Sequence, residues 1–299
     1  MKRKNILGGL VVGVTGISSF FILLIIVLVM VNIISNGMKT FSFQFLTEAP
    51  TEGMTAGGIY PAIIGTFLRV LIMTIIGVPI GAITAIYLSE YASSSSKFAR
   101  MIRFAVNTLA GVPAIVFGLF GLGFFVQFVG KGMDYALQAD GVLKWAQPNL
   151  LWASLTMALL TLPVVIVSVE EAIRTVPREL REASLALGAT KWQTIMKIVI
   201  PNSFTGVLTG GILAISRGAG EVAPILFTGA AYFLPHLPGS LADQFMELGY
   251  HIYIMSTQSA DVEATQGIQY ATTMVLLVFT FSLNFIAVFL RYRMRKRAF

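Results

Sequence analysis

The chain has 299 residues, of which 56% are hydrophobic and only 12% charged, and its mean hydropathy is +0.80. A soluble domain of this length carries about a quarter charged residues, so the composition excludes an ordinary soluble protein and favours a membrane protein. The net charge of +7 does not indicate nucleic acid binding, because the basic residues stand in short blocks beside apolar runs. With no cysteine and two isolated histidines, His236 and His251, no metal site is expected.

Six stretches are apolar and long enough to cross a bilayer as helices, since one span needs about 20 residues. They run over 14–35, 61–88, 104–129, 150–169, 203–232 and 270–290. The first follows Lys2, Arg3 and Lys4 and could be a secretory signal, but its apolar run is longer than an h-region and no small-x-small cleavage site follows. We therefore expect a retained helix and an all-α, polytopic bundle of six transmembrane helices.

Lysine and arginine are distributed unevenly among the segments outside these stretches. They gather at the N-terminus, after the second and fourth stretches and in the C-terminal tail, whereas the other side holds only Lys39, Lys131 and Lys144. By the positive-inside rule this distribution predicts that both termini are cytoplasmic. An even number of spans is consistent with that prediction.

The predicted cytoplasmic segment 170–201 is longer than a turn and has the pattern of two short amphipathic helices. Their apolar positions are Leu180, Ala183, Ser184 and Leu187, then Trp192, Ile195, Met196 and Val199. Gly188 predicts the end of the first helix, Thr190 with Gln193 matches a capping box for the second, and Pro201 is expected to close the unit. The spacing leaves two interpretations open: a hairpin lying on the bilayer surface, or a docking element for a cytoplasmic partner.

Seven residues of this segment resemble the EAA loop of ATP-binding-cassette (ABC) importer permeases, which reads E-A-A, three residues, G, nine residues, I, one residue, L-P. The matching residues are Glu182, Ala183, Ser184, Gly188, Ile198, Ile200 and Pro201, with serine in place of alanine and isoleucine in place of leucine. In that family the loop's short helix fits a cleft on a separate ATPase. The resemblance therefore implies a coupling role for Glu182 and Gly188 above all, for Ala183, Ser184, Ile198 and Pro201 beside them, and for the neighbouring Thr190.

The resemblance covers about residues 60–291 and implies a type I ABC importer permease fold with a cytoplasmic coupling-helix hairpin at 170–201. Residues 1–59, which hold the first helix and an external loop, lie outside the shared core. Residues 292–299 form a basic tail.

Three ionisable residues, Arg69, Arg217 and Glu221, fall inside the predicted spans. Each charge near the bilayer centre costs about 2.5–3.5 kcal/mol on insertion scales, so the default interpretation is a pathway for a solute or ion. Arg217 and Glu221 are four residues apart and share a helix face, either as a buried salt bridge or as part of the pathway, where arginine's forked donors would suit an oxyanion. Arg69 lies nearer the external end of its span; snorkelling to the interface would explain it, and a pathway role is the alternative.

Two further segments resemble phosphate-importer permeases. Residues 216–228 are similar to that family's R-A-x-G-E-T-A-P-L-L-F-T, with Val222 in place of threonine and Ile225 in place of leucine, and residues 85–91 look like its A-I-Y-L-x-E-Y. The ending of the first segment points to the PstA type of subunit. Arg69 has no counterpart in this pattern. Phosphate follows from the resemblance alone, and a permease for sulfate or molybdate stays open.

The resemblance implies several partners in a bacterial or archaeal plasma (inner) membrane. They are a homologous permease of the PstC type, a dimer of ATP-binding subunits that hydrolyse ATP with Mg, an extracytoplasmic phosphate-binding protein, and membrane lipids. The predicted external loops 130–149 and 233–268 would form part of the docking face for the binding protein.

The chain itself is expected to bind no cofactor and to be no enzyme. It has no P-loop, and its one dinucleotide-like match, Gly218-x-Gly220-x-x-Ala223, lies in a predicted membrane helix without a preceding strand. Two other classes of function stay open. One is an ion-driven secondary transporter that uses Glu221 as proton carrier, and the other is a membrane anchor without transport activity.

Overall fold

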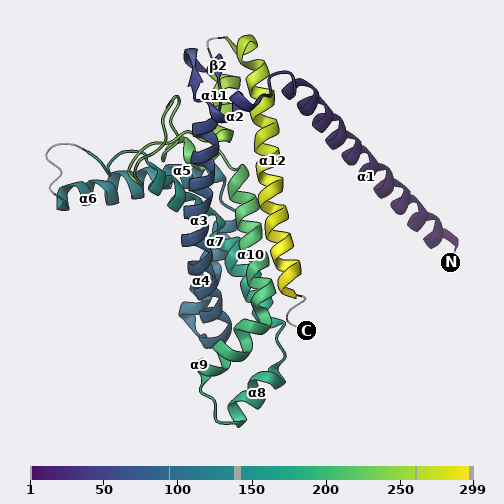
Figure 1. Cartoon of the computed structure of the whole chain (residues 1–299). Coiled ribbons are helices and arrows are strands. Elements are labelled where there is room, and N and C mark those ends of the chain that lie inside the picture. Colours follow the sequence, from purple (N-terminus) through teal and green to yellow (C-terminus); the bar gives the residue numbers. More distant parts are fainter. Residues whose placement is uncertain (1, 94, 138–142, 260, 296–299) are drawn as a thin grey trace.

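The computed structural model describes residues 2–93, 95–137, 143–259 and 261–295, and helices dominate this part of the chain (Figure 1). Six of the described helical segments are long and apolar enough to cross a membrane: Gly8–Gly37, Tyr60–Tyr91, Ala114–Ala136, Leu150–Arg174, Lys191–Gly220 and Val262–Arg293. This confirms the predicted all-α bundle of six transmembrane helices. The tail expected over 292–299 is described only as far as Arg295, so Lys296 and Arg297 lie outside the described residues.

The centre of the bundle is built on α7 (Leu150–Arg174), which packs between α3 (Tyr60–Ile86) and α10 (Ile200–Gly220). The sequence has G-x-x-x-G spacings at Gly77/Gly81 on α3 and at Gly206/Gly210 on α10, and these glycines face α7. Cβ atoms built on Gly77 and Gly210 would lie 3.3 Å from Ala158 and 3.1 Å from Ser168 of α7. Small residues let helix backbones approach closely, which is how membrane helices gain packing energy without a hydrophobic driving force.

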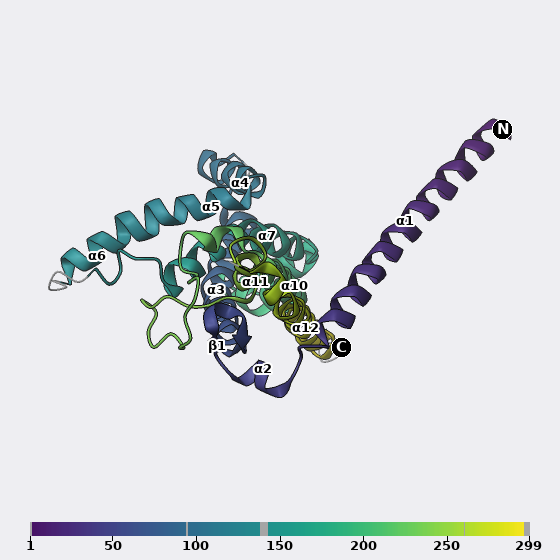
Figure 2. The same ribbon diagram turned by 90° about the horizontal axis from the view of Figure 1, so that it is seen from above.

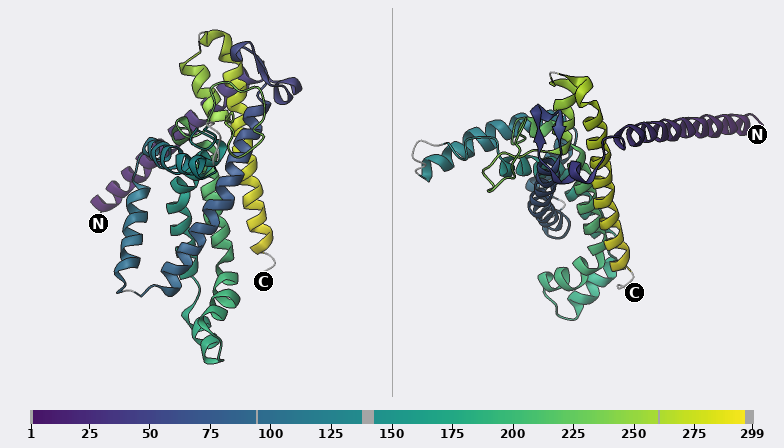
Figure 3. Two further views of the ribbon diagram at one scale, coloured as in Figure 1. Left: turned by 90° about the vertical axis from the view of Figure 1, so that its left-hand side faces the viewer. Right: turned by 45° about the horizontal axis from the view of Figure 1, so that its top comes forward.

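The long C-terminal helix α12 (Val262–Arg295) runs beside α10, and α11 (Leu248–Thr257) packs against its first turns (Figures 1 and 3). Around α11 the chain adds α2 (Phe43–Thr47), a hairpin of β1 (Pro50–Thr51) with β2 (Ala56–Gly57), and η1 (Glu52–Met54). We call this the α11 end. The opposite end carries α8 (Arg178–Ala186) and α9 (Lys191–Thr194), and we call it the hairpin end.

The first helix, α1 (Lys2–Gly37), touches the bundle only where it ends. A Cβ on Gly37 would lie 2.9 Å from the carbonyl oxygen of Tyr270 in α12, whereas residues 8–29 are exposed. From that contact α1 slants away from the other helices, as Figure 2 shows from above.

The third span differs from the predicted 104–129. The chain forms α4 (Lys97–Ala110), breaks at 111–113, and continues as α5 (Ala114–Gly121), a π-helical stretch η3 (Leu122–Gly130) and α6 (Lys131–Ala136). Pro113 causes the break, because it cannot donate to the ladder and pushes the residue before it out of the helical region. The apolar helix is therefore 114–136, which runs sideways out of the bundle (Figure 1), and α4 is a separate amphipathic helix.

The fifth span also begins and ends elsewhere than predicted. It starts at Lys191, because Pro201 does not close the hairpin: α9 continues through the π-helical stretch η4 (Ile195–Val199) into α10, with Pro201 in the first turn. A π-bulge re-routes the backbone bonds that a proline would otherwise break. The fifth span stops at Gly220 and not at the predicted residue 232, because the backbone of Glu221 is extended and Pro224 lies in the short 3-10 helix η5 (Ala223–Leu226).

The last span begins earlier than the predicted residue 270. Since α12 starts at Val262, the segment 233–268 that was expected to be an external loop contains α11 and the first turns of α12. Residue 260 of that segment, and residues 138–142 of the other predicted external loop, lie outside the described residues.

Candidate functional site

Arg69 is sealed inside the α11 end. Its side chain is 0% exposed; Nη2 lies 3.1 Å from Oε1 of Glu247, and Nη1 donates to the carbonyl oxygen of Gly218 at 2.8 Å. The other carboxylate oxygen of Glu247 accepts from the backbone N–H of Tyr250 and so caps α11. Arg69 therefore joins α3 to the last turn of α10 and to the start of α11, and the snorkelling explanation is wrong because this guanidinium has its partners inside the protein.

Glu247 was missed as a functional residue, since the sequence placed it in a polar external loop. A usable signal existed. A buried arginine needs an anion within reach, and the predicted external loop after span five carries Asp243, Glu247, Asp261 and Glu263. What the sequence could not supply is the pairing itself, which joins residues 178 positions apart.

Arg217 and Glu221 are adjacent to this sealed group but open. Nε of Arg217 lies 3.8 Å from Oε1 of Glu221, and the two side chains are 40% and 30% exposed. Gly218, whose carbonyl holds Arg69, directly follows Arg217, and a Cβ there would lie 2.5 Å from the sulfur of Met73. Arg69 and Met73 thus hold the helical turn that carries Arg217, while the guanidinium of Arg217 is accessible and only loosely paired.

At the hairpin end the predicted local structure is confirmed. Gly188 ends α8 with φ of +85°, a conformation that residues with a side chain rarely adopt. The Thr190 hydroxyl accepts from the N–H of Gln193 at 3.2 Å, and the Gln193 side chain accepts from the N–H of Thr190 at 2.8 Å, which completes the capping box. A hydrogen bond of 2.9 Å between the hydroxyl groups of Ser184 and Thr194 connects the two helices. The hairpin therefore has a defined shape.

Much of the hairpin's apolar surface is uncovered. Ile195 and Val199 face the bundle and are buried, but five large apolar side chains are not: Leu180, Leu185, Leu187, Trp192 and Met196. Leu187, beside the Gly188 turn, is 90% exposed. Glu182 is exposed on the same helix. Several large exposed apolar side chains beside charged ones are typical of an interaction site.

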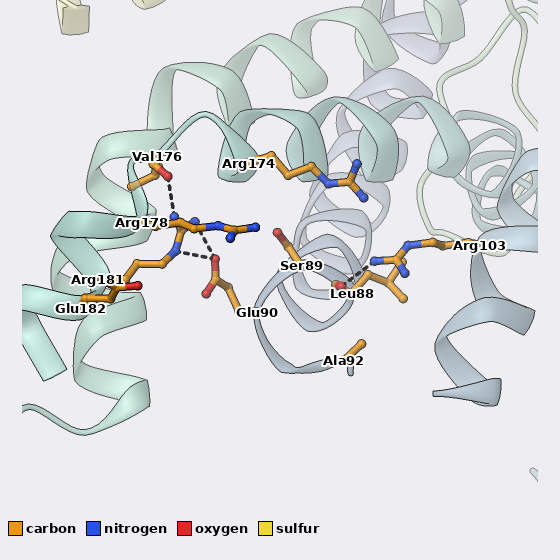
Figure 4. A pocket seen from close by; sticks show the side chains of 10 residues that line it. All are labelled: Leu88, Ser89, Glu90, Ala92, Arg103, Arg174, Val176, Arg178, Arg181 and Glu182. Atoms are coloured by element: carbon orange, nitrogen blue, oxygen red, sulfur yellow. Dashed lines mark hydrogen bonds and ion pairs between the residues drawn. The ribbon is translucent and has the colours of Figure 1, made fainter. Parts of the chain in front are cut away.

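Arg181 fastens this hairpin to the rest of the chain (Figure 4). Its Nη2 donates to Oε1 of Glu90 at 2.8 Å and to the carbonyl oxygen of Ile173 at 2.9 Å, and its Nη1 donates to the carbonyl oxygen of Val176. Glu90 lies in η2 (Tyr87–Tyr91), the π-helical end of α3. One guanidinium thus connects α8 with the ends of both α3 and α7. Sequence reasoning missed Arg181, although Glu90 stands in the segment 85–91 that carried the family resemblance.

A second group of ion pairs lies beside it. Nη2 of Arg103 donates to the carbonyl oxygen of Leu88 at 2.7 Å and to Oε1 of Glu170 at 2.9 Å, and Arg174 reaches the same carboxylate oxygen at 2.6 Å. Between these groups and the hairpin is an open cavity of about 790 Å³. Figure 4 shows four arginines around it, Arg103, Arg174, Arg178 and Arg181, together with Glu90 and Glu182.

Among the described residues no cluster of acidic, histidine or cysteine side chains could hold a metal ion. The predicted coupling residues and the predicted membrane charges occupy different places. Glu182, Ala183, Ser184, Gly188 and Thr190 lie on the hairpin; Ile198 and Pro201 lie where it runs into α10; Arg217 and Glu221 lie where α10 ends. A single continuous helical segment, Lys191–Gly220, joins the two places.

A multi-pass helical bundle with charges exposed at a break in one span, and with an exposed amphipathic hairpin at the start of that same span, is typical of membrane permease components. The model of the family described as "Binding-protein-dependent transport system inner membrane component" matches residues 77–296, and the chain belongs to this family. It is thus a multi-pass inner-membrane component of an ABC transporter.

Relatives within the family are similar over different lengths. The chain is 33% identical to the probable ABC transporter permease protein YqgI of Bacillus subtilis (strain 168) over 278 residues, 88% of either chain. It is 33% identical to the phosphate transport system permease protein PstA of Haemophilus influenzae over 219 residues, which are 73% of this chain and 72% of that one. PstA of Mycobacterium leprae is 42% identical over 171 residues, 57% of this chain and 51% of the mycobacterial one, so the match spans about half of that relative.

Solved structures confirm the fold. A bacterial ABC transporter involved in the import of the acidic polysaccharide alginate has a chain with TM-score 0.61 and 15% identity, covering 92% of this chain and 95% of that one. The MetNI methionine ABC transporter in an inward-facing conformation gives a TM-score of 0.55 at 17% identity, covering 79% and 94%. The architecture is that of a type I ABC importer permease.

Proposed function

We propose that this chain is a PstA-type permease subunit of an ATP-driven phosphate importer, in which it forms half of the phosphate pathway and works by alternating access. The observation that carries the proposal is the hairpin at 178–199: it has the spacing of the EAA loop, exposes apolar side chains, and continues without interruption into α10, whose last turn carries Arg217. The names of its PstA relatives support phosphate as the substrate.

The hairpin is the contact with a separate ATPase. Leu187 and Trp192 are 90% and 59% exposed, a degree of apolar exposure that a protein partner would cover. When the ATPases close on ATP, the hairpin moves with them, and because Arg181 holds Glu90 and the end of α7, that movement reaches α3 and α7 as well as α10. This chain contributes no catalytic residue to ATP hydrolysis, which belongs to the partner subunits with Mg.

Arg217 is the group that meets the anion. Its guanidinium is 40% exposed and 3.8 Å from the carboxylate of Glu221, so an arriving oxyanion can displace a weak pair instead of a tight one. Arg69 supports this position from behind through Gly218. The homologous permease of the PstC type would supply the facing half, and an extracytoplasmic phosphate-binding protein would deliver phosphate at the α11 end.

The orientation follows from the same proposal. The hairpin end, both termini and the basic tail are cytoplasmic, in a bacterial plasma membrane. A cysteine at Thr190 should react with a membrane-impermeant reagent only after the cells are opened. Labelling of intact cells would place the hairpin outside and contradict the docking role.

The experiment that tests the function is uptake of radiolabelled phosphate by cells whose own copy is deleted, complemented with wild-type or Arg217→Ala protein. Wild type should restore uptake, and the variant should lower it at least tenfold at unchanged protein level, because the anion loses its forked donor. Arg293→Ala, an exposed arginine on α12, is the matched control and should behave as wild type.

Labelled sulfate and molybdate, tested in the same strain, decide the substrate. Restored sulfate or molybdate uptake with no phosphate uptake would replace phosphate by another oxyanion. Uptake that follows an ion gradient and not the ATPase would instead favour the secondary transporter with Glu221 as proton carrier.

A further inference from the structure

Another arginine meets α10 at the other end of the helix. Near the hairpin end α10 and α12 lie side by side (Figures 1 and 3) and enclose a groove of about 390 Å³. Its lining residues are Thr205, Gly206, Thr209, Val288, Arg291 and Tyr292. They include one cation and three hydroxyl side chains but no carboxylate. The groove is large enough for a tetrahedral anion with its hydration water.

The guanidinium of Arg291 is only partly used. Nη1 donates to Oγ1 of Thr209 at 3.2 Å, and this hydroxyl donates in turn to the carbonyl oxygen of Thr205 at 2.8 Å. In the part of the chain that the structure describes, Nε and Nη2 of Arg291 have no hydrogen-bond or ion-pair partner, and neither does the hydroxyl of Thr205. Two guanidinium nitrogens, which carry three N–H bonds, and one hydroxyl therefore remain as donors at one groove among the described residues.

This differs from the other arginines that lie against the bundle. Arg69, Arg103, Arg174, Arg181 and Arg217 each face a glutamate. Arg291 is half-buried against Thr209 and faces none among the described residues. A guanidinium held in place by one bond and left without a counter-ion is suited to take an anion from outside the chain.

Its depth along α12 narrows the choice of anion. Phe285, Val288 and Phe289 before it are exposed apolar residues, whereas Arg293 and Arg295 follow it in the sequence. Arg291 thus stands where an apolar span changes into a basic tail, which is the depth of lipid headgroups. At this depth phosphate groups are the anions at hand, either as lipid headgroups or as inorganic phosphate near the membrane surface.

The groove also lies on the same row of α10 as the proposed anion site. Thr205, Thr209, Leu213 and Arg217 follow one another at intervals of four residues and therefore form one ridge of the helix. All four are accessible or half-accessible. Arg217 is eight positions after Thr209, which is about 12 Å along the helix axis. An anion released from Arg217 toward the hairpin end would reach Arg291 along this ridge.

We propose that Arg291, with Thr205 and Thr209, forms a second binding site for a phosphate group at the hairpin end of the α10–α12 groove. The group is either that of a phospholipid or inorganic phosphate leaving the pathway. Only the second source rests on the proposed function; the chemistry of the groove does not.

The test uses the full importer complex, purified in a neutral detergent, and follows its melting temperature against ligand concentration. The probes are short-chain dioctanoylphosphatidylglycerol and inorganic phosphate. Dioctanoylglycerol, which has the same acyl chains but no phosphate, controls for the acyl chains, and chloride at equal ionic strength controls for salt. Wild type should show a saturable rise with at least one probe. Arg291→Gln should weaken that response at least tenfold, and Arg291→Lys should weaken it less, since it keeps the charge without the fork.

Arg293→Gln is the matched control, because it removes the same charge two residues away from an exposed position outside the groove. It should leave the response as in wild type. A response that Arg291→Gln weakens identifies a lipid site if the lipid alone gives it, and an exit site if phosphate gives it. Equal weakening in Arg291→Gln and Arg293→Gln, or no saturable response in wild type, would overturn the proposal. If the wild-type complex does not transport phosphate but still responds to the lipid, the proposed function is wrong and the proposed site at Arg291 is supported.

Discussion

Arginine–glutamate pairs hold the two ends of this bundle together, but one end is sealed and the other is open. At the α11 end the side chains of Arg69 and Glu247 are 0% and 1% exposed, whereas at the hairpin end those of Arg181 and Glu90 are 19% and 10% exposed and that of Arg103 is 37% exposed. Separating a sealed pair leaves an uncompensated buried charge, while opening a partly exposed pair costs less. The α11 end is thus built to keep one geometry, and the hairpin end is built to change.

The two ends of the bundle should respond differently to a force during transport. Arg217 follows the sealed end directly, through Gly218, so its position is set by contacts that resist change. The hairpin is tied by contacts that water can replace. A force applied at the hairpin would then move the start of the Lys191–Gly220 segment more easily than its end.

The largest effect is expected from Arg69→Ala. Removing one partner of a buried pair destabilises a protein by about 3–5 kcal/mol, and Glu247 would be left charged and buried. The yield of folded protein in the membrane should drop severely, and any protein that is recovered should melt at a much lower temperature. Size-exclusion profiles and melting curves of the detergent-purified complex measure both.

The double variant Arg69→Met with Glu247→Gln separates charge from packing. It removes both charges and keeps an amide oxygen that can cap α11, so much of the lost stability should return. A single variant that folds and melts as wild type would mean that the α11 end is not sealed and that the contrast between the ends is wrong.

Gly188→Val should give the second largest effect, this time on transport. A β-branched residue is strained at φ of +85°, by about 1–2 kcal/mol, so the turn between α8 and α9 must change its shape. Phosphate uptake should be lost while insertion and melting stay close to wild type, because nothing lies within 4 Å of a Cβ built at this position.

Gly132→Val is the control for Gly188→Val. Gly132 in α6 also has no atom within 4 Å of its built Cβ, but its φ is not positive. Uptake in this control should be near normal. Normal uptake in Gly188→Val itself would remove the coupling role from the hairpin.

Arg181→Ala should have a smaller effect. It removes hydrogen bonds to Glu90 and to the carbonyl oxygens at the end of α7. Hydrogen bonds of a charged group contribute about 1.5–3 kcal/mol each to stability when they are buried, and less when they are hydrated. Amide hydrogen exchange in α8 should become faster, and uptake should fall without being abolished. Arg178→Ala on the same helix, exposed and without a bond partner among the described residues, should leave exchange unchanged. Unchanged exchange in both variants would show that Arg181 does not fasten the hairpin.

What the sequence predicted well is local. The six spans follow from apolar runs, the end of α8 follows from Gly188, and the start of α9 follows from Thr190 and Gln193, since each depends only on residues within one or two turns. Pro113 and Gly220 mark the two breaks in the sequence, but the predicted spans ran across both. Hydropathy alone continues across them.

What the sequence could not predict is which charges meet. Arg69 and Glu247 are 178 residues apart, and Arg181 and Glu90 are 91 apart. No periodicity links such positions. The resemblance at 85–91 included Glu90 but gave no reason for a glutamate there. In the structure its carboxylate accepts a hydrogen bond from Arg181, the residue before Glu182. The continuous passage of the hairpin through Pro201 into α10 was also hidden, because it depends on a π-bulge with no sequence signature.

The smallest predicted effect tests whether the α11 end is sealed against protons. His251 in α11 is 2% exposed, and burial lowers its pKa to about 4. The unfolded chain, with a histidine pKa of about 6.5, takes up the proton first, so between pH 6.5 and 4 the unfolded state binds more protons and stability falls as the pH falls. From pH 7.5 to 5.5 the loss should be about 1 kcal/mol. Melting curves at three pH values would measure it.

Two variants assign this slope. His251→Gln should flatten the dependence of the melting temperature on pH whatever it does to the stability at pH 7.5, whereas His236→Gln, in an exposed loop, should keep the wild-type slope. If His251→Gln keeps the full slope, the imidazole is reached by water in the folded state. The α11 end would then be open to water at His251. The fixed position of Arg217 would in that case come from the hydrogen bonds of Arg69 and not from the packing around α11.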